Sequence, residues 1–346
     1  MREFYSDTQT KPTRAMREAA LSVEVGDERH DDDPCTLELC ERVADMLGME
    51  AAVFLPSGTM CNEIAIAVHT KPGDEVICTR ESHIIFAESG GPAALSGVMM
   101  SPIDGERGMF TPDELEAYIR PSSAHAPRSR LVVAEQTANL AGGAVWPVDQ
   151  LNAVAKAAKS AGLATHLDAA RILNAQVATG VLARDYARDF DSAWIAFTKG
   201  LACPVGAVLA GSRAFIDEAW LLKRRWGGAM RQTGVLTAMC LYALDNHVER
   251  LAEDHALAKM IGDRLQDLPA ISNVLPVDTN IVIADLDPSA PDARETSRRL
   301  REMGVTVTVV GKRRLRIVTH LDVGPADAEA LIDAMDKVIE ESAATV

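Results

Sequence analysis

The sequence has 346 residues, of which 47% are hydrophobic and 25% charged, and its formal net charge is −15. A chain of this length can form one large domain with a substantial core and a smaller appended domain, and its composition is that of an ordinary globular protein. The acidic balance argues against nucleic acid or an anionic membrane as the main partner, because both attract basic surfaces.

The cysteines and the amino terminus indicate a cytoplasmic protein. The six cysteines include no C-x-x-C pair and are irregularly spaced, which favours reduced thiols over a disulfide framework. The first residues, MREFYSDTQTKP, lack the apolar region of a signal peptide, and no stretch reaches the roughly 18 apolar residues of a membrane span. We therefore expect neither secretion nor membrane insertion.

An extended polar arm is expected over residues 1–15, with Ser6 inside it. Pro12 marks the turn into a helix over Thr13–Ser22. The acidic loop Gly26–Pro34 follows and leads into a second amphipathic helix over Cys35–Leu47, whose first turn suits the proline.

The stretch AAVFLPSGTMCN predicts a short strand, then a Pro-Ser-Gly-Thr turn, then a helix from about Met60. Such a junction presents free backbone N–H groups and the positive end of a helix dipole to an anion. Ser57, Gly58 and Thr59 are therefore the candidate phosphate site, and a helix cap without a ligand is the alternative. Patterns for a dinucleotide fold or a Walker loop do not occur.

Apolar runs of strand length then alternate with helical segments, which predicts a mostly parallel, doubly wound α/β sheet. The expected strands are Glu75–Thr79, Val98–Ile103, Leu131–Glu135, Ala164–Leu167 and Ala193–Phe197, and the helices include Pro112–Ile119 and Val148–Ala161.

Asp168 and Lys199 each close one of these buried strands. Open α/β sheets bind ligands at the carboxyl ends of their strands, so both groups should meet in one crevice. A lysine and a carboxylate together suit pyridoxal phosphate, which needs the lysine for a Schiff base and the acid against its pyridinium nitrogen. Considered separately, Asp168 could simply cap the following helix and Lys199 could be a surface lysine without a function.

Three further residues near these strands are candidates. Arg171, three positions after Asp168, could reach the phenolate oxygen of the cofactor or another anion. His83 lies just beyond a strand end, where a ring stacked on the pyridine and a solvated side chain are about equally expected. His125 lies in the loop before Leu131, and the fold alone gives it no role.

The segment RRWGGAMRQTG follows an expected helix over Ala214–Arg225 and precedes a long one over Val235–Leu251. Its arginines near a glycine turn, Arg231 among them, suggest anion recognition, although ion pairs with this chain's own carboxylates are the alternative.

Residues 16–252 should form the large domain and residues 253–346 a small α+β domain with strands Asn280–Asp285, Val305–Val310 and Leu315–Thr319. Arg314 and Arg316 share one face of the last strand, and one of them is a candidate clamp for a substrate carboxylate.

Taken together, these motifs resemble the L-threonine aldolase family of fold-type I pyridoxal-phosphate enzymes along nearly the whole chain. The matching blocks include SDT at Ser6–Thr8, FLPSGTMCN at Phe54–Asn62, AESGG at Ala87–Gly91, LDAAR at Leu167–Arg171, TKGLACPVG at Thr198–Gly206, GGAMRQTG at Gly227–Gly234 and IVTHLDV at Ile317–Val323. Several blocks in the right order are far more specific than any one of them.

The resemblance implies roles for the candidate residues. It makes Lys199 the Schiff-base lysine, pairs Asp168 with the pyridinium, places Arg171 on the phenolate oxygen, and assigns the phosphate to Gly58 and Thr59 beside Ser57. It stacks His83 on the ring and brings His125 to the substrate hydroxyl. It gives Arg316 and Ser6 the substrate carboxylate, and Arg231 would line a site from a neighbouring subunit. No metal site is expected.

The implied activity is retro-aldol cleavage of L-threonine, L-allo-threonine or a related L-β-hydroxy-α-amino acid to glycine and an aldehyde. The base is open between His83, His125 and a water held by them. The family implies a homotetramer whose active sites lie at a dimer interface. A pyridoxal-phosphate β-eliminating lyase is the alternative, and a catalytically idle binding homologue is a third interpretation.

The sequence departs from the family pattern at positions that bear on the substrate. Ala87 and Ala138 stand where larger side chains are expected, and Tyr5, His30 and Arg224 also differ. If the two alanines border the β-substituent of the substrate, the pocket should admit groups larger than a methyl, and L-phenylserine should be cleaved at least as well as threonine. The alternative is that Phe86, Tyr5 or His30 fills this space and restores a threonine-sized site.

Overall fold

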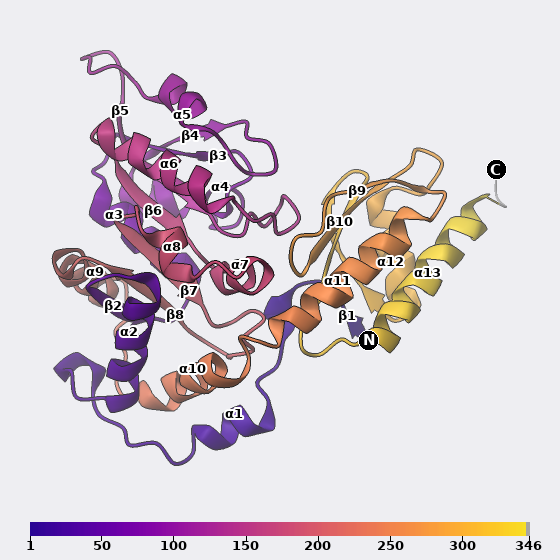
Figure 1. The fold of residues 1–346 in the computed structure, drawn as a ribbon, viewed down its shortest axis with the longest axis horizontal. Helices are drawn as coiled ribbons and strands as arrows, with labels where there is room; N and C mark the ends of the chain where they lie inside the picture. The colour runs from indigo at the N-terminus through magenta and orange to yellow at the C-terminus, as the bar shows by residue number, and fades with distance from the viewer. Residues whose placement is uncertain (344–346) are drawn as a thin grey trace.

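A central sheet organises the larger of two units that lie side by side in the computed structural model, which describes residues 1–343 (Figure 1). Over that range the sheet has seven strands in the order β2-β8-β7-β6-β5-β3-β4. Only β8 runs antiparallel to its neighbours among the described strands of this sheet, so the prediction of a mostly parallel α/β sheet is confirmed. The strands are β2 (Ala51–Leu55), β3 (Asp74–Thr79), β4 (Met99–Ile103), β5 (Arg128–Glu135), β6 (Ala164–Asp168), β7 (Ser192–Ala196) and β8 (Ala207–Gly211).

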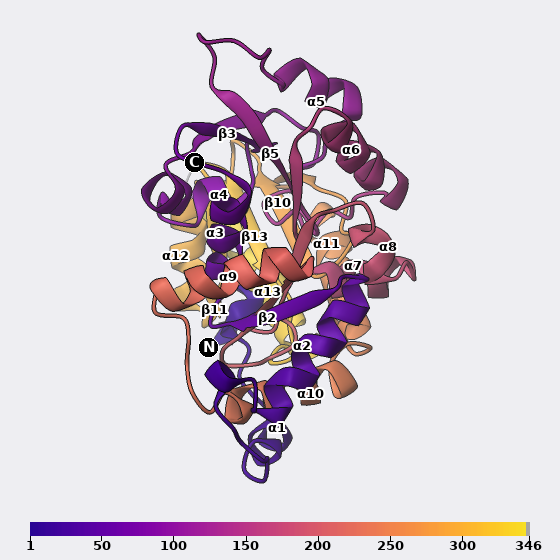
Figure 2. The same cartoon turned by 90° about the vertical axis from the view of Figure 1, so that its left-hand side faces the viewer.

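Helices cover both faces of this sheet, because successive side chains of a strand point to opposite faces. In β7, Trp194 and Ala196 belong to the apolar cluster beneath α3 and α9, whereas Ala193 and Ile195 belong to the larger cluster on the other face. Figure 2 shows α9 crossing the sheet on the first of these faces. The helices of this unit are α1 (Arg14–Ala19), α2 (Pro34–Leu47), α3 (Gly58–His69), α4 (His83–Phe86), α5 (Pro112–Tyr118), α6 (Val148–Ser160), α7 (Ile172–Thr179), α8 (Ala183–Ala187), α9 (Arg213–Arg225) and α10 (Gly234–Asn246), with short helical turns η1 (Asp7–Gln9), η2 (Glu28–His30) and η3 (Pro92–Ser96).

The predicted long helix over Val235–Leu251 begins where expected but ends early, because α10 stops at Asn246 and a separate helix, α11 (Leu251–Gln266), starts at Leu251. The break is held by His247, which is buried and whose Nδ1 lies 2.9 Å from the carbonyl oxygen of Leu201. A side chain tied to a neighbouring loop fixes the chain direction at this point, and α11 then turns into the smaller unit (Figure 1).

The smaller unit is built on an antiparallel sheet with the order β12-β13-β10-β9. Its elements are α11, β9 (Ile271–Val274), β10 (Ile281–Leu286), α12 (Ala293–Glu302), β11 (Val305–Thr306), β12 (Thr308–Gly311), β13 (Arg314–Val318) and α13 (Pro325–Ala343). The predicted single strand Val305–Val310 is two strands, because β11 pairs with the amino-terminal strand β1 (Arg2–Glu3) and β12 pairs with β13.

The amino-terminal arm is therefore part of the smaller unit as well as a path to the larger one. Phe4 is fully buried in the core of the smaller unit, and its carbonyl accepts a hydrogen bond of 2.9 Å from the N–H of Val318. The arm then crosses to the sheet of the larger unit, which carries Asp7 to the strand ends described below.

The structure also shows the state of the cysteines and the character of the helices. All six cysteines are unpaired within residues 1–343. In the same range, no helix combines the length and the apolar character that a membrane span requires.

Candidate active site

The predicted cofactor residues meet at one edge of the large sheet, where its parallel strands end. Asp168 is the last residue of β6, Lys199 follows β7, and Ser57 follows β2. His83 begins α4 just beyond the end of β3. This is the edge at which open α/β sheets bind ligands.

Asp168 is held by an amide that sequence reasoning missed. The carboxylate is 1% exposed, and its Oδ2 accepts a hydrogen bond of 2.9 Å from Nδ2 of Asn62 on α3. The other end of this amide accepts from Nε1 of Trp194 at 2.8 Å and lies 3.1 Å from Nε2 of His166. Burial lowers the pKa of His166 to about 3, so its ring is neutral, and its Nε2 is the donor because the amide oxygen of Asn62 can only accept. The polar pair Asn62 and Glu63 in a mainly apolar helix was the available signal.

Lys199 is partly buried, and its amine is easier to deprotonate than a surface lysine. Burial lowers its pKa to about 8, and the positive charge of Arg171 adds to the effect, whereas Asp168 and Asp7 oppose it. Its Nζ lies 5.5 Å from the centre of the Trp194 ring. A fraction of unprotonated amine near neutral pH is what nucleophilic attack on a carbonyl requires.

Arg171 is engaged by a carboxylate from the amino-terminal arm. Its Nε and Nη2 each donate to Asp7 at 2.7 Å, and both side chains are buried. Burial favours the protonated acid, but the Arg171 guanidinium outweighs it and holds the pKa of Asp7 far below its usual range. Sequence reasoning missed Asp7, whose partner lies 164 positions away. The predicted contact of Arg171 with a phenolate would use Nη1, which donates only a long hydrogen bond of 3.5 Å to Oδ1 of Asn139.

Arg316 lies at the same edge, on β13, without a carboxylate partner in the described chain. It is 8% exposed, its Nη1 donates to Oδ1 of Asn139 at 2.9 Å, and its Nε has no hydrogen-bond partner. Burial lowers the pKa of this guanidinium to about 10, and the nearby Arg171 adds to the effect. Asp7 offsets this effect only in part, and the hydrogen-bond acceptors of Arg316 are neutral, so the buried cation is suited to an anionic ligand.

The second clamp candidate differs sharply. Arg314 donates from Nε and Nη2 to both oxygens of Asp285, at 2.6 and 2.8 Å. Its guanidinium is neutralised by this bidentate pair, so the structure favours Arg316 over Arg314 as an anion ligand.

Ser6 lies beside these groups and is buried. Its hydroxyl oxygen accepts from the backbone N–H of Thr8 at 3.2 Å and from the Thr8 hydroxyl at 2.9 Å, and it lies 3.4 Å from Oδ1 of Asp7. The Ser6 hydroxyl therefore caps η1, and it sits next to the Asp7–Arg171 pair.

The predicted phosphate site is the amino-terminal end of α3. The Ser57 hydroxyl accepts a hydrogen bond of 3.2 Å from the N–H of Met60, which leaves the N–H groups of Gly58 and Thr59 at the open end of a twelve-residue helix. Gly58 is required there, because a side chain would overlap the ring of Trp194. The end of α3 carries partial positive charge for an anion.

His83 is anchored at two points by acids. Its backbone N–H donates to Oε2 of Glu135 at 2.8 Å, and its Nδ1 lies 2.8 Å from Oε1 of Glu88. Burial alone would lower the pKa of His83, but the hydrogen bond to Glu88 and the charges of Asp168 and Glu135 raise it. The other ring nitrogen, Nε2, is the one left for a ligand.

Two predicted residues are not brought to this edge within one chain. His125 is exposed in the loop before β5, and β5 spans eight residues, so its ends are roughly 25 Å apart. Arg231 is 56% exposed and bound to Asp27, with 2.7 Å between Nη1 and Oδ2. Within residues 1–343, neither side chain is hydrogen-bonded to another predicted site residue.

The structure also bears on the space near the two alanines. Ala138 is 4% exposed and packs in an apolar cluster with Ala141, Ala144 and Met109. Protein atoms fill the room that a larger side chain would take, so the expected enlargement of the substrate pocket by Ala138 is not supported. Ala87 is exposed at the end of α4.

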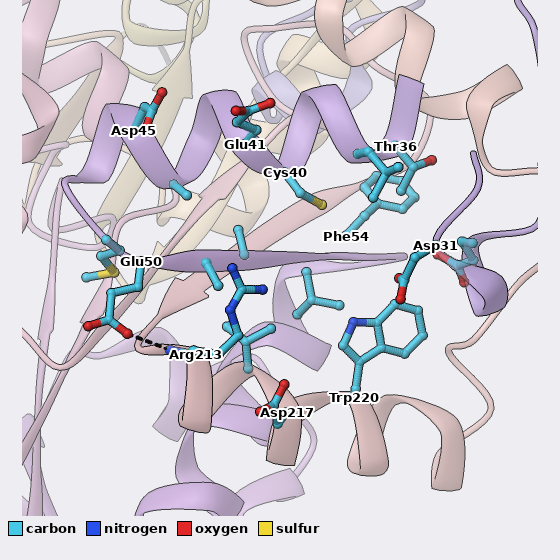
Figure 3. A pocket seen from close by; sticks show the side chains of 18 of the residues that line it. Asp31, Thr36, Cys40, Glu41, Asp45, Glu50, Phe54, Arg213, Asp217 and Trp220 are labelled. Atoms are coloured by element: carbon cyan, nitrogen blue, oxygen red, sulfur yellow. Dashed lines mark hydrogen bonds between the residues drawn. The ribbon is translucent and has the colours of Figure 1, made fainter. Parts of the chain in front are cut away.

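A hollow of about 540 Å³ lies elsewhere, along β2 between α2 and α9 (Figure 3). Its lining includes Glu41, Asp45, Asp217 and Arg213, and the backbone N–H of Arg213 donates to Glu50 at 2.9 Å. None of the predicted cofactor or substrate residues lines it, so the two places are distinct.

Comparison with known proteins agrees with this geometry. The family model described as "Beta-eliminating lyase" matches residues 3–289. A probable low-specificity L-threonine aldolase 2 of Arabidopsis thaliana is 38% identical, over 97% of this chain and 96% of that protein. The low specificity L-threonine aldolase of Escherichia coli K12 is 36% identical, over 93% of this chain and 95% of that protein.

Solved structures share the fold. A threonine aldolase of Leishmania major superposes with a TM-score of 0.81 at 19% identity, covering 98% of this chain and 100% of that one. An aspartate aminotransferase of Thermus thermophilus superposes with a TM-score of 0.77 at 15% identity, covering 97% and 91%. The predicted fold-type I architecture is confirmed by these neighbours.

Proposed function

We propose that this chain, which belongs to the β-eliminating lyase family and within it to the low-specificity L-threonine aldolases, cleaves L-threonine, L-allo-threonine or a related L-β-hydroxy-α-amino acid to glycine and an aldehyde. The observation that carries the proposal is the buried Arg316, which shares Asn139 with Arg171 and has an unpartnered Nε, because an amino-acid carboxylate would complete the hydrogen bonds and the charge balance of this guanidinium.

The residues at the sheet edge fit pyridoxal phosphate as the cofactor. The lowered pKa of Lys199 suits covalent attachment, Asp168 supplies a fixed carboxylate, and the open end of α3 suits a phosphate. The group supplies, when bound, a protonated pyridine ring that accepts the electrons of a bond broken at the substrate Cα. Asn62 keeps Asp168 oriented for that ring through its 2.9 Å hydrogen bond.

Arg316 would hold the substrate carboxylate through its free Nε and fix which bond at Cα is set for cleavage. Ser6 is the second candidate for that carboxylate. Its hydroxyl would have to turn from Asp7, 3.4 Å away, to donate to the substrate.

A base must take the proton of the substrate hydroxyl as the Cα–Cβ bond breaks. His83 is the candidate within the chain, because Glu88 fixes its Nδ1 and leaves Nε2 to reach the substrate. His125 is the candidate from a second chain, and a bound water held by either imidazole would serve equally.

In an oligomer whose neighbouring chains complete each other's sites, Arg231 and His125 could contact the substrate of the adjacent chain. We propose that this oligomer is a homotetramer. A cytoplasmic location likewise remains a prediction.

Product analysis tests the reaction. The purified enzyme given L-threonine should form glycine and acetaldehyde, whereas β-elimination would give ammonia and a keto acid. Lys199→Ala should abolish turnover, together with the visible absorbance band that borohydride removes from the wild type. A wild-type protein without such a band, or a Lys199→Ala variant with most of its aldolase activity, would contradict the proposal.

A further inference from the structure

Two carboxyl groups, Glu63 and Glu88, lie buried behind His83 at the edge of the site. Glu63 is on α3, one residue after Asn62, and is 2% exposed, while Glu88 follows α4 and is 4% exposed. The Glu63 carboxyl packs directly against the backbone of Gly91, where any side chain would overlap with it. The proposed mechanism uses Glu88 only as the partner of His83, and it gives Glu63 no role.

If both acids are ionised, three of their four oxygens have no hydrogen-bond donor within residues 1–343. Oε1 of Glu88 accepts from Nδ2 of Asn62 at 2.7 Å and lies 2.8 Å from Nδ1 of His83. Oε2 of Glu88 and both oxygens of Glu63 have no donor in the described chain. Glu63 and Glu88 interact directly, and two buried carboxylates without donors would be strongly destabilising, whereas a single shared proton supplies the missing hydrogen bond.

The charged groups around the pair do not offer a cation to Glu63. Glu88 is the ionisable group that perturbs it, and His83 is bound to the far oxygen of Glu88. Glu135 from β5, Asp168 from β6 and Lys199 after β7 face His83. His83 therefore contacts Glu88 rather than Glu63, and no cation pairs directly with Glu63 in the described chain.

We propose that Glu63 is a carboxylic acid that donates a hydrogen bond to Oε2 of Glu88 and is thereby a positioning residue for His83. Glu88 then stays a carboxylate, Nδ1 of His83 carries the hydrogen that Glu88 accepts, and Nε2 faces the substrate. The same carboxylate holds Asn62, which holds Asp168, so one acid pair orients groups on both sides of the cofactor site. The functional part of this inference rests on the proposed aldolase activity.

The protonation of Glu63 has independent support. Burial, followed by the charge of Glu88, raises its pKa to about 8. Glu63 should therefore remain neutral at neutral pH and ionise only in alkaline solution.

Infrared spectroscopy of the full-length protein tests the protonation state directly. The wild type should show the C=O stretch of a protonated carboxylic acid at pH 7, and this band should fade as the pH rises through about 8. Glu63→Gln should remove the band. Glu75→Gln is the matched control, because Glu75 is 1% exposed but accepts from Ser129 and is paired with Arg120, so its substitution should leave the band.

The coupling to His83 is tested by two variants of similar size. Glu63→Gln can still donate to Glu88, whereas Glu63→Leu cannot. We expect Glu63→Gln to keep kcat within about twofold of wild type and Glu63→Leu to lose about tenfold, one lost hydrogen bond to a charged group. In ring NMR spectra, His83 should sense the ionisation near pH 8 in wild type and not in Glu63→Gln.

The proposal is overturned if the acid band persists in Glu63→Gln, or if both variants leave kcat and the His83 titration unchanged. The infrared and NMR measurements do not depend on turnover. An acid band that belongs to Glu63 in a protein that forms no glycine from threonine would refute the aldolase activity and leave the protonated acid standing.

Discussion

Arg316 and Arg314 stand two residues apart on β13, and their surroundings differ in charge. Arg314 is neutralised by Asp285, whereas Arg316 meets only neutral acceptors. Replacing a planar fork with a point charge at Arg316 should cost about 1.5–3 kcal/mol of substrate binding, or roughly 10- to 150-fold in KM. Steady-state kinetics of Arg316→Lys measure this effect.

Arg314→Lys is the matched control for that measurement, since it changes the same side-chain type on the same strand. Its KM should stay close to that of wild type. A larger rise in KM for Arg314→Lys than for Arg316→Lys would reverse our assignment of the carboxylate ligand.

A substitution at Ala138 tests whether this residue is part of the packed core or borders the substrate. Its side chain faces Met109 and Ala141 in a closed apolar cluster, so Ala138→His should lower stability by about 1–3 kcal/mol through overpacking. The ratio of kcat/KM for L-phenylserine to that for L-threonine should not change. Urea unfolding and kinetics on both substrates are the measurements.

Ala87→His serves as the comparison, because Ala87 is exposed and should tolerate the larger side chain without loss of stability. If Ala138→His instead keeps wild-type stability and changes the substrate ratio, Ala138 borders the substrate after all.

At the scale of elements, the strand ends were predictable and the contacts between distant segments were not. Asp168 and Lys199 come at the ends of mainly apolar runs of strand length, and a buried strand that ends near a charged residue can be recognised from the sequence. Asp7 lies in a polar arm that resembles a solvated tail, and nothing local signals its buried pair with Arg171. Such pairing depends on the chain path between two units.

The carboxyl-terminal end of the helix predicted over Val235–Leu251 was wrong for the same reason. The sequence from Val235 onward has continuous helical character, and the interruption comes from His247 binding the carbonyl of Leu201 in another part of the chain. Asn62 and Glu63 are a local signal that the sequence does contain. Two polar residues on a buried helix need hydrogen-bond partners, so they indicate a buried polar network.

The arm itself offers a prediction at this scale. Asp7→Asn leaves the buried Arg171 guanidinium without its counter-charge, which should cost about 3–5 kcal/mol in the free energy of unfolding at pH 7. Asp7 has a lowered pKa, so its stabilising contribution is present above its ordinary pKa of 3.8 and is lost as the pH falls through the folded value. The difference between wild type and variant should therefore shrink on acidification below about 3.8.

Denaturant unfolding at several pH values measures that difference. Asp27→Asn is the control, because it breaks the exposed Asp27–Arg231 pair and should change stability little. Equal losses in the two variants, or an Asp7→Asn loss that does not depend on pH in the acid range, would show that the Asp7–Arg171 pair does not anchor the arm.

At the scale of the whole molecule, the single chain leaves Arg231 bound to Asp27 rather than at the sheet edge. If neighbouring chains exchange this residue, two inactive variants should repair one another. A hybrid of Lys199→Ala and Arg231→Ala chains contains one site with Lys199 from one chain and Arg231 from the other, and one site that lacks both. In a symmetric dimer, random 1:1 mixing should restore about a quarter of the wild-type sites.

Co-expression with two affinity tags, followed by assay of the mixed oligomer, measures the recovery. Lys199→Ala mixed with Asp168→Asn is the control, because Asp168 ends β6 and Lys199 follows the adjacent strand β7 of the same chain, so no hybrid of these variants contains an intact site. Recovery in the first mixture and none in the second would place Arg231 in the site of its neighbour. Activity in the first mixture no greater than the sum of its parents would mean that each chain completes its own site, and Arg231 would then serve only the loop that holds Asp27.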